Sequence, residues 1–201
     1  LRDEWVMKPG DPAVASLSQD IVGGEGNVYL VLKDIYDWIR RNISYSTSSG
    51  VPQDALTTLD TRKGDCDDQS ILFCSLARAA GVPAWLQLGA MYVGMEDSWG
   101  GHAWLQAYVP LEEGGGEKVV IDVVNGEFMV WRPNRFVEFT DDGDADHLLD
   151  YYYILSMRSG SEADLYDDYE ALRYVESDKK ISQGVVWEIM PDERLLASSR
   201  T

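Results

Sequence analysis

Cysteine is scarce in this sequence: the 201 residues contain only Cys66 and Cys74. Both fall in one segment that we expect to be helical, where eight positions correspond to about 12 Å at a rise of about 1.5 Å per residue. That separation is too long for a disulfide. We therefore expect no structural disulfide, and the cysteine count does not assign a redox compartment.

Long apolar runs and basic residues are also lacking. No stretch approaches the roughly 20 apolar residues that a membrane helix needs. Only 17 Lys and Arg stand against 35 Asp and Glu, for a net charge of −18, which disfavours nucleic acid or an anionic membrane as a partner. The acidity is typical of a solubility adaptation, with a preference for cationic substrates as the alternative. The chain begins at Leu1 rather than at a methionine, so an upstream signal or anchor, and with it the localisation, is left open. The sequence does not indicate the oligomeric state either.

The length and a hydrophobic content of 45% fit one domain. We expect residues 1–26 to be an N-terminal segment, 27–124 the core, and 125–201 the strands and helix that complete the domain. Asn27 is a good N-cap for a helix over 28–42, whose apolar residues recur at helical spacing.

A second helix is predicted over residues 66–80, almost wholly apolar and therefore buried. Asp65, Asp67 and Asp68 cluster at its start, where helices favour carboxylates, and Gly81 ends it. Cys66 stands at this positive end, which stabilises a thiolate and so lowers the thiol pKa below the value of about 8.5 for free cysteine. The neighbouring aspartates oppose this ionisation.

Strand patterns follow at 84–93, 102–109 and 118–124, joined by short turns that favour antiparallel pairing. Short apolar runs at 128–131 and 135–139 extend the predicted sheet. The aromatic run 150–157 predicts a further strand, residues 165–175 an acidic amphipathic helix, and residues 185–189 a final strand.

Two of these strands supply partners for the thiol. His102 lies 36 positions after Cys66 (102 − 66), near the start of one strand, and Asp122 lies 20 positions further on (122 − 102), at the end of the next. In such an arrangement the imidazole takes the thiol proton and the carboxylate fixes the imidazole tautomer.

Three motifs in this order resemble the transglutaminase-like superfamily of papain-fold cysteine enzymes, of prokaryotic type: Gly-Asp-Cys-Asp-Asp before an apolar helix, Gly-His-Ala-Trp, and Val-Ile-Asp. The resemblance runs from about Ile35 to Asp122. It implies an α+β, papain-like fold in which a buried helix carrying Cys66 packs on an antiparallel sheet. It also implies that Cys66 is the nucleophile, His102 the general base and acid, and Asp122 the orienting carboxylate. The sequence departs from the family pattern around Asp122, with Lys118-Val119-Val120 before it and Val123-Val124-Asn125 after it.

Three further residues are weaker candidates for substrate or oxyanion contacts. In the resembling family an aromatic residue at a place similar to Tyr45 lies beside the cysteine, although plain packing is the alternative. Gly101, next to Gly100, would let a substrate backbone come close, unless the pair only forms a tight turn. Trp99 belongs to the same segment.

An acidic loop provides weak candidates for calcium ligands. Asp142, Asp144 and Asp146 follow the D-x-D-x-D opening of a calcium loop, but His147 and Tyr153 occupy positions where an EF-hand needs glycine and glutamate. An EF-hand is excluded, and a looser calcium site remains an alternative to a solvated loop. We expect no other cofactor.

We therefore expect a transglutaminase-like cysteine peptidase or amidase that acts on a protein or peptide. Hydrolysis is favoured over crosslinking because many prokaryotic members of the resembling family look like peptidases. The alternatives are a true crosslinking transglutaminase and a catalytically silent papain-fold binding module. A zinc site built on Cys66 and His102 is disfavoured because the sequence has no short-spaced ligand pair.

Overall fold

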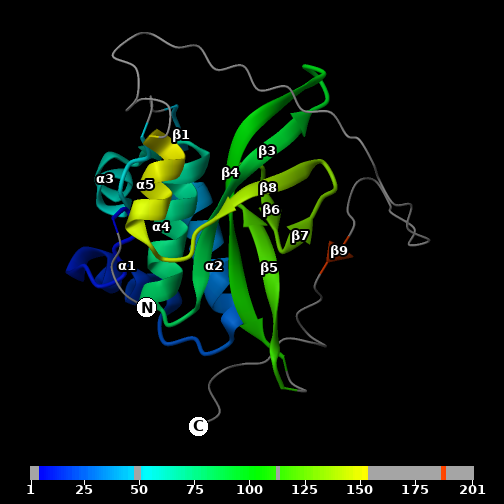
Figure 1. Cartoon of the computed structure of the whole chain (residues 1–201). Helices are drawn as coiled ribbons and strands as arrows, with labels where there is room; N and C mark the ends of the chain where they lie inside the picture. Colours follow the sequence, from blue (N-terminus) through cyan, green and yellow to red (C-terminus); the bar gives the residue numbers. More distant parts are fainter. Residues whose placement is uncertain (1–4, 48–50, 112–113, 154–186, 189–201) are drawn as a thin grey trace.

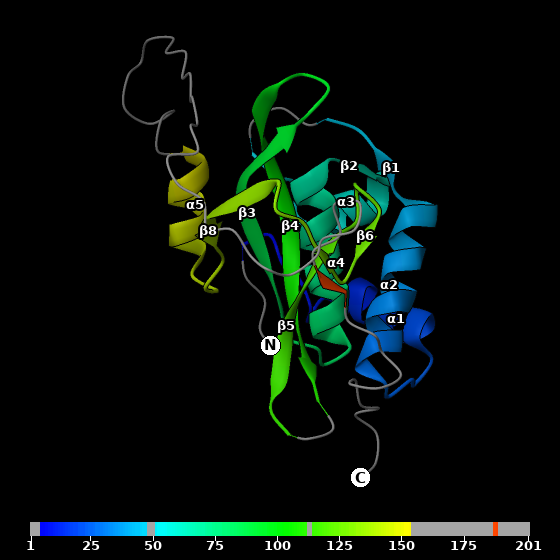
Figure 2. The ribbon, with the colours of Figure 1, turned by 90° about the vertical axis from the view of Figure 1, so that its right-hand side faces the viewer.

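The computed structural model describes residues 5–47, 51–111, 114–153 and 187–188. Helices α1–α4 gather on one side of a five-stranded sheet (Figures 1 and 2). This arrangement confirms the α+β class that the sequence predicted. None of the helices in these ranges is both long and apolar enough to cross a bilayer.

Side-chain caps start the first three helices. Asp11 accepts a hydrogen bond from the backbone of Ala13 at the start of α1 (Pro12–Val22). Asn27 does the same for α2 (Val28–Asn42), as predicted, and Asp54 for α3 (Ala55–Thr61). Each cap satisfies a backbone donor that the helix itself leaves unpaired.

Helix α4 (Cys66–Ala79) is the buried helix that the sequence predicted. Asp65 is its N-cap, and the Asp68 carboxylate accepts hydrogen bonds from the backbone of Asp65 (3.2 Å) and of Gln53 (2.6 Å). Cys74 is fully buried within it, whereas Cys66 is partly accessible at its first position, and neither cysteine forms a disulfide. The carboxylates of Asp65 and Asp68 therefore hold the backbone on either side of Cys66 at the start of the helix.

The main sheet has the strand order β6-β5-β4-β3-β8. Its members are β3 (Ala84–Val93), β4 (Ser98–Pro110), β5 (Gly116–Asp122), β6 (Glu127–Phe128) and β8 (Arg135–Thr140). All of its pairs are antiparallel, as predicted. Two small pairs complete the described strands: β1 (Ser44–Tyr45) with β2 (Lys63–Gly64), and β7 (Val130–Trp131) with β9 (Trp187–Glu188).

The two faces of the sheet have different roles. Alternate residues of β3, β4 and β5, including Leu86, Leu105 and Ile121, join the helices in one hydrophobic core. The residues between them point to the other face, and these include His102, Trp104 and Asp122. The face away from the core therefore carries the polar residues of interest.

Strands β4 and β5 separate where these residues lie. Their pairing runs from Leu105 with Ile121 to Pro110 with Gly116, so residues 98–104 of β4 extend beyond it. The turn after Asp122 leads into β6 instead. This opening leaves room for the start of α4 to reach the backbone of β4.

Gly89 gives a test of the sheet geometry. The β3–β8 register shifts between Leu88 and Gly89, and a Cβ on Gly89 would overlap the carbonyl oxygen of Phe136. We expect Gly89→Ala to lower the free energy of unfolding by about 3 kcal/mol, because backbone cannot move aside as a side chain can. Gly100→Ala is the control, since nothing lies within 4 Å of its added Cβ. Equal denaturant midpoints for the two variants would contradict the close approach.

The structure corrects two predictions. The run 128–131 was expected to extend the sheet, but Val130–Trp131 form β7, which pairs with β9 outside the main sheet. The aromatic run 150–157 was expected to form a strand, but its described residues, 150–153, belong to a helix, α5 (Ala145–Tyr153). Leu148 and Tyr152 are four positions apart, so a helix places both against the core, and Tyr151 packs on Phe139. Packing at helical period outweighs the strand preference of tyrosine.

Other predictions fall outside what is described. The helix predicted over 165–175 lies outside the described residues, as does most of the strand predicted at 185–189, of which 187–188 form β9. The division into one domain stays a prediction.

Candidate active site

His102 and Asp122 form the central contact of the candidate site. Nε2 of His102 lies 2.7 Å from Oδ2 of Asp122, and the two side chains are 8% and 1% exposed. Burial raises the pKa of Asp122, but hydrogen bonds from His102 and Asn125 outweigh it and lower the pKa to about 2. Because an ionised carboxylate only accepts hydrogen bonds, Nε2 carries the proton. The other ring nitrogen, Nδ1, is left free to accept one.

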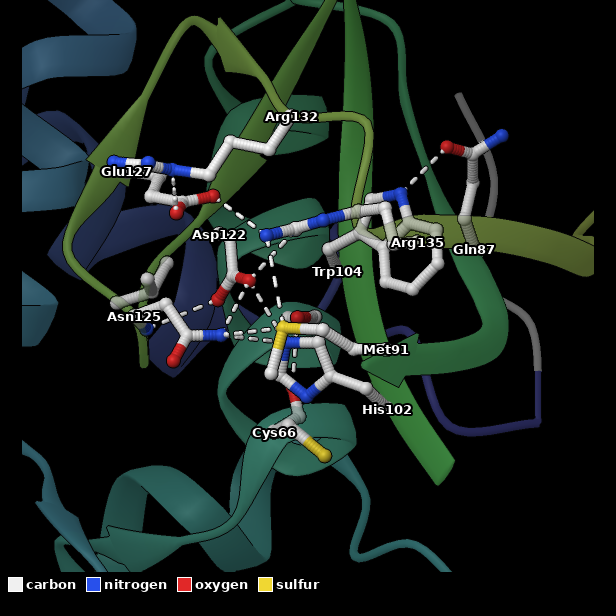
Figure 3. Close-up of polar contacts among 12 residues, drawn as sticks. Cys66, Gln87, Met91, His102, Trp104, Asp122, Asn125, Glu127, Arg132 and Arg135 are labelled. Atoms are coloured by element: carbon white, nitrogen blue, oxygen red, sulfur yellow. Dashed lines mark hydrogen bonds and ion pairs between the residues drawn. The ribbon is translucent and has the colours of Figure 1, made fainter. Parts of the chain in front are cut away.

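Cys66 lies on the opposite side of the imidazole from Asp122 (Figure 3). Its sulfur accepts hydrogen bonds from the backbone N–H groups of Ala103, the residue after His102, and of Asp67. In the described ranges, no hydrogen bond joins this sulfur to the imidazole. The structure thus brings all three residues of the predicted triad together, with the thiol beside the ring rather than bonded to it.

The Cys66 thiol is less acidic than the helix position suggested. Burial raises its pKa to about 12, with a further contribution from the negative charge of Asp67, while the two backbone hydrogen bonds act in the opposite direction. The expected gain from the helix N-terminus is therefore outweighed. In the resting protein Cys66 is a neutral thiol, which needs a base to become a nucleophile.

Asp67 is itself unusual. Burial, followed by its hydrogen bond with Asp65, raises the pKa of Asp67 to about 8. The Tyr152 hydroxyl of α5 donates to its Oδ2 at 2.9 Å. Carboxylate oxygens of Asp65, Asp67 and Asp68 lie within 4.8 Å of one another, and oxygen ligands of this kind are able to hold a divalent cation.

Tyr45 lies near the thiol. Tyr45 is 59% exposed, and partial burial, followed by the charges of Cys66 and Asp65, raises the pKa of its hydroxyl. A pocket of about 160 Å³ adjoins it, lined by Arg40, Ile43, Tyr45, Gln69, Val123 and Val124. Since this lining includes residues next to Asp122 and one turn after Cys66, the pocket borders the candidate site.

Trp99 and Gly101 alternate with His102 along β4, so their side-chain positions face the other side of the strand. The Trp99 ring packs near Tyr92, at 5.5 Å between centroids, and Phe136, at 5.3 Å. Gly101 is exposed, and nothing lies within 4 Å of the position that a Cβ would take. An approaching backbone would thus meet no side chain there.

The acidic loop 142–147 makes its side-chain hydrogen bonds within itself rather than with Cys66, His102 or Asp122. Oδ1 of Asp142 accepts from the backbone of Asp144, and Oδ1 of Asp144 accepts from that of Asp146. Oδ2 of Asp142 lies 2.9 Å from Nδ1 of His147. These are local turn contacts, and a looser calcium site stays the alternative to a solvated loop.

Comparison with known proteins decides the family. The model of the transglutaminase-like superfamily matches residues 15–117, just over half of the chain. This chain belongs to the transglutaminase-like superfamily. Cys66 and His102 fall within the match and Asp122 follows it. The family assignment made from the three motifs is therefore confirmed.

Two solved structures are similar to this transglutaminase-like protein. One is a candidate cysteine protease from Cytophaga hutchinsonii, with 27% identity and a TM-score of 0.53, over 67% of this chain and 43% of that one. The other is LapG from Legionella pneumophila, with 17% identity and a TM-score of 0.52, over 69% of this chain and 92% of that one. The chain thus spans less than half of the Cytophaga protein. No curated protein matches it.

Sequence reasoning missed three residues around Asp122 in this transglutaminase-like protein. Asn125 donates to Asp122 through its backbone (3.0 Å) and its amide (2.8 Å). Arg135 also donates to Asp122, at 2.8 Å, and contacts Glu127 at 2.7 Å. Asn125 had a sequence signal, as it stands where the family pattern departs after Asp122. Arg135 had only its place as a charge at the start of a mostly apolar run.

Asp67 predicts a pH effect on stability. Because its pKa is raised from 3.8 to about 8, folding favours the neutral acid, so this contribution is full below about pH 4 and is lost as pH rises through 8. Between pH 5 and pH 8 the free energy of unfolding of the wild-type protein should fall by on the order of 4 kcal/mol, and that of Asp67→Asn should not show this fall. Urea unfolding at both pH values measures this. Asp60→Asn, at an exposed position, should behave as wild type, and equal pH dependence in Asp67→Asn would contradict the assignment.

Proposed function

We propose that this protein is a thiol-dependent acyl-transfer enzyme that hydrolyses an amide bond in a peptide or protein. The observation that supports this most is the 2.7 Å contact between His102 and Asp122 with Cys66 on the other side of the ring (Figure 3). That order of thiol, imidazole and carboxylate is the one in which histidine activates a nucleophile.

The proposed reaction begins with proton transfer. Nδ1 of His102 takes the proton from the neutral Cys66 thiol as the sulfur attacks the carbonyl carbon. The imidazolium that forms is stabilised by the ionised Asp122. When the tetrahedral intermediate collapses, the C–N bond breaks and His102 returns the proton to the leaving amine.

A thioester on Cys66 remains. His102 then takes a proton from water as the water oxygen attacks the thioester carbonyl. The C–S bond breaks, the sulfur regains a proton from His102, and a carboxylic acid leaves. If a lysine amine attacks in place of water, the same steps produce a crosslink.

Substrate contacts follow from what surrounds the sulfur. We assign the backbone N–H of Cys66 and the hydroxyl of Tyr45 as oxyanion donors. Gly101 leaves space for the substrate backbone, and the pocket beside Tyr45 is placed to take a substrate side chain. These steps use the chain's own backbone and side chains, the substrate and water.

Hydrolysis is preferred to crosslinking because the Cytophaga relative is described as a candidate cysteine protease. A second function, a binding module without chemistry, is favoured by one observation: the pKa of Cys66 is raised to about 12. In that case the folded site would hold a peptide without forming a thioester.

One experiment separates these functions. The protein is incubated with a peptide library and a primary amine such as monodansylcadaverine, and the products are read by mass spectrometry. Cleaved peptides support the proposal, and amine adducts at the expense of cleavage support crosslinking. Peptides that are retained but unchanged support the binding module, and either of the last two results overturns hydrolysis.

A further inference from the structure

A chain of buried charges leads away from Asp122 on the side opposite His102. Arg135, on β8, donates from one terminal nitrogen to Asp122 Oδ2 (2.8 Å) and from the other to Glu127 Oε2 (2.7 Å). The Asp122 oxygen is the same one that contacts His102. Glu127 in turn pairs with Arg132. Figure 3 shows these side chains in a row ending at Cys66.

The sheet itself brings the two carboxylates together. Asp122 and Glu127 are directly paired residues of β5 and β6, and like charges at such positions repel each other. Their side chains are 1% and 10% exposed, and that of Arg135 is 3% exposed. Water therefore screens this repulsion little, and Arg135 is the cation that lies between them.

The Arg135 guanidinium has little freedom to move. It lies 5.3 Å from the centre of the Trp104 ring. The Trp104 indole N–H donates to Gln87 at 2.8 Å, and the Gln87 amide contacts Thr140. The fork between the two carboxylates is thus held by an aromatic platform that is itself fixed by hydrogen bonds.

We propose that Arg135 and Glu127 are positioning residues that set how strongly Asp122 stabilises the protonated form of His102. This inference rests on the proposed function, because it concerns the base of that reaction. Arg135 competes with the imidazolium for the same carboxylate oxygen and weakens the hold of Asp122 on it. Glu127 partly neutralises the positive charge of Arg135, so that Asp122 stabilises the imidazolium more strongly than it would beside an unpaired arginine.

The charges that face this pair are few in the described ranges. His102 has Asp122 and Cys66 beside it, with Asp65 and Asp67 next to Cys66. Arg135 has Asp122 and Glu127, and Glu127 has Arg132 as well. Variants of Arg135 and Glu127 thus change the field at His102 without touching the thiol.

The two residues should act in opposite directions. Removing the positive charge with Arg135→Met leaves Asp122 free to hold the imidazolium, so His102 becomes a neutral base only at higher pH. Removing the negative charge with Glu127→Gln directs Arg135 fully at Asp122, so the neutral base appears at lower pH. A merely structural role predicts lower activity in both variants but no opposite shifts.

The test follows the rate of Cys66 alkylation by iodoacetamide against pH, in a Cys74→Ala background. Below the pH at which His102 loses its proton the thiol has no base, so the profile should have an acid-side inflection. We expect that inflection to move up by about one pH unit in Arg135→Met and down by about half a unit in Glu127→Gln. Arg132→Met, which removes a charge one step further away, should move it least.

Shifts in the same direction, no shift in either variant, or a wild-type profile without an acid-side inflection would overturn the inference. Arg135→Met leaves Glu127 paired with Arg132, and Glu127→Gln keeps an oxygen acceptor for Arg135, so at least one variant should fold, as circular dichroism will show. Alkylation needs no substrate. A protein that shows the opposite shifts but cleaves no peptide would therefore refute the proposed function and not this inference.

Discussion

Replacing Cys66 with alanine should abolish peptide turnover, with a loss of at least about 10⁴-fold in kcat/KM. Cys66 is at the first position of α4, where its sulfur accepts hydrogen bonds from the backbone of Ala103 and Asp67. No other described thiol is accessible, because Cys74 is fully buried. Without the sulfur there is no atom to form the thioester. Turnover of the peptides that the wild-type protein cleaves measures this directly.

The matched control is Cys74→Ala, eight positions along the same helix. It removes a thiol from the core and should cost some stability, but it should leave kcat/KM close to that of the wild type. Thermal unfolding of both variants shows whether the fold is kept. Turnover that persists in folded Cys66→Ala would end the proposal of a cysteine enzyme.

Asp122→Asn is expected to reduce kcat/KM on the order of 10³-fold. Oδ2 of Asp122 accepts from His102, Asn125 and Arg135, and Oδ1 accepts from the Asn125 backbone. An amide nitrogen at either place would face another donor. It would also remove the charge that stabilises the imidazolium, and at the Oδ2 place it would favour the tautomer with its proton on Nδ1, which is unable to take the thiol proton.

The same variant has a pH signature in stability. The pKa of Asp122 is lowered from 3.8 to about 2, so its contribution is present above about pH 4 and is lost as pH falls through 2. Asp122→Asn should therefore unfold about 2 kcal/mol more easily at pH 6, with the difference closing towards pH 2. Acid titration of both proteins by circular dichroism checks this. Asp54→Asn removes a carboxylate from a helix cap instead, and it should leave turnover unchanged.

Most elements of the core of the fold could be predicted from the sequence. Helical periodicity identified α2, an almost wholly apolar segment between helix start and stop signals identified α4, and strand patterns with short turns identified β3, β4 and β5. Three short motifs were enough to name the residues that meet at the site, because they resemble those of a known family. Cys66 begins α4 and Asp122 ends β5, whereas His102 lies within β4. How close the three residues come follows from the fold of the family rather than from periodicity alone.

What the sequence could not show depends on packing between distant segments. Arg135 and Glu127 are ordinary charged residues until β8 and β6 place them beside Asp122. The start of the run 150–157 was predicted as a strand, since three tyrosines favour one. In helix α5, Tyr151 instead packs on Phe139 and Tyr152 donates to Asp67. The thiol of Cys66 was expected to gain acidity from its helix, but burial and Asp67 raise its pKa.

The central claim is that sulfur, imidazole and carboxylate act as one unit to carry an acyl group. Acid-quenched mass spectrometry after mixing with p-nitrophenyl acetate tests it most directly. We predict one acetyl group on the peptide that contains Cys66, and less than a tenth of that labelling in His102→Ala. Acetylation of Cys66 at the same rate in wild type and His102→Ala, or no acetyl group on Cys66 at all, would contradict the account.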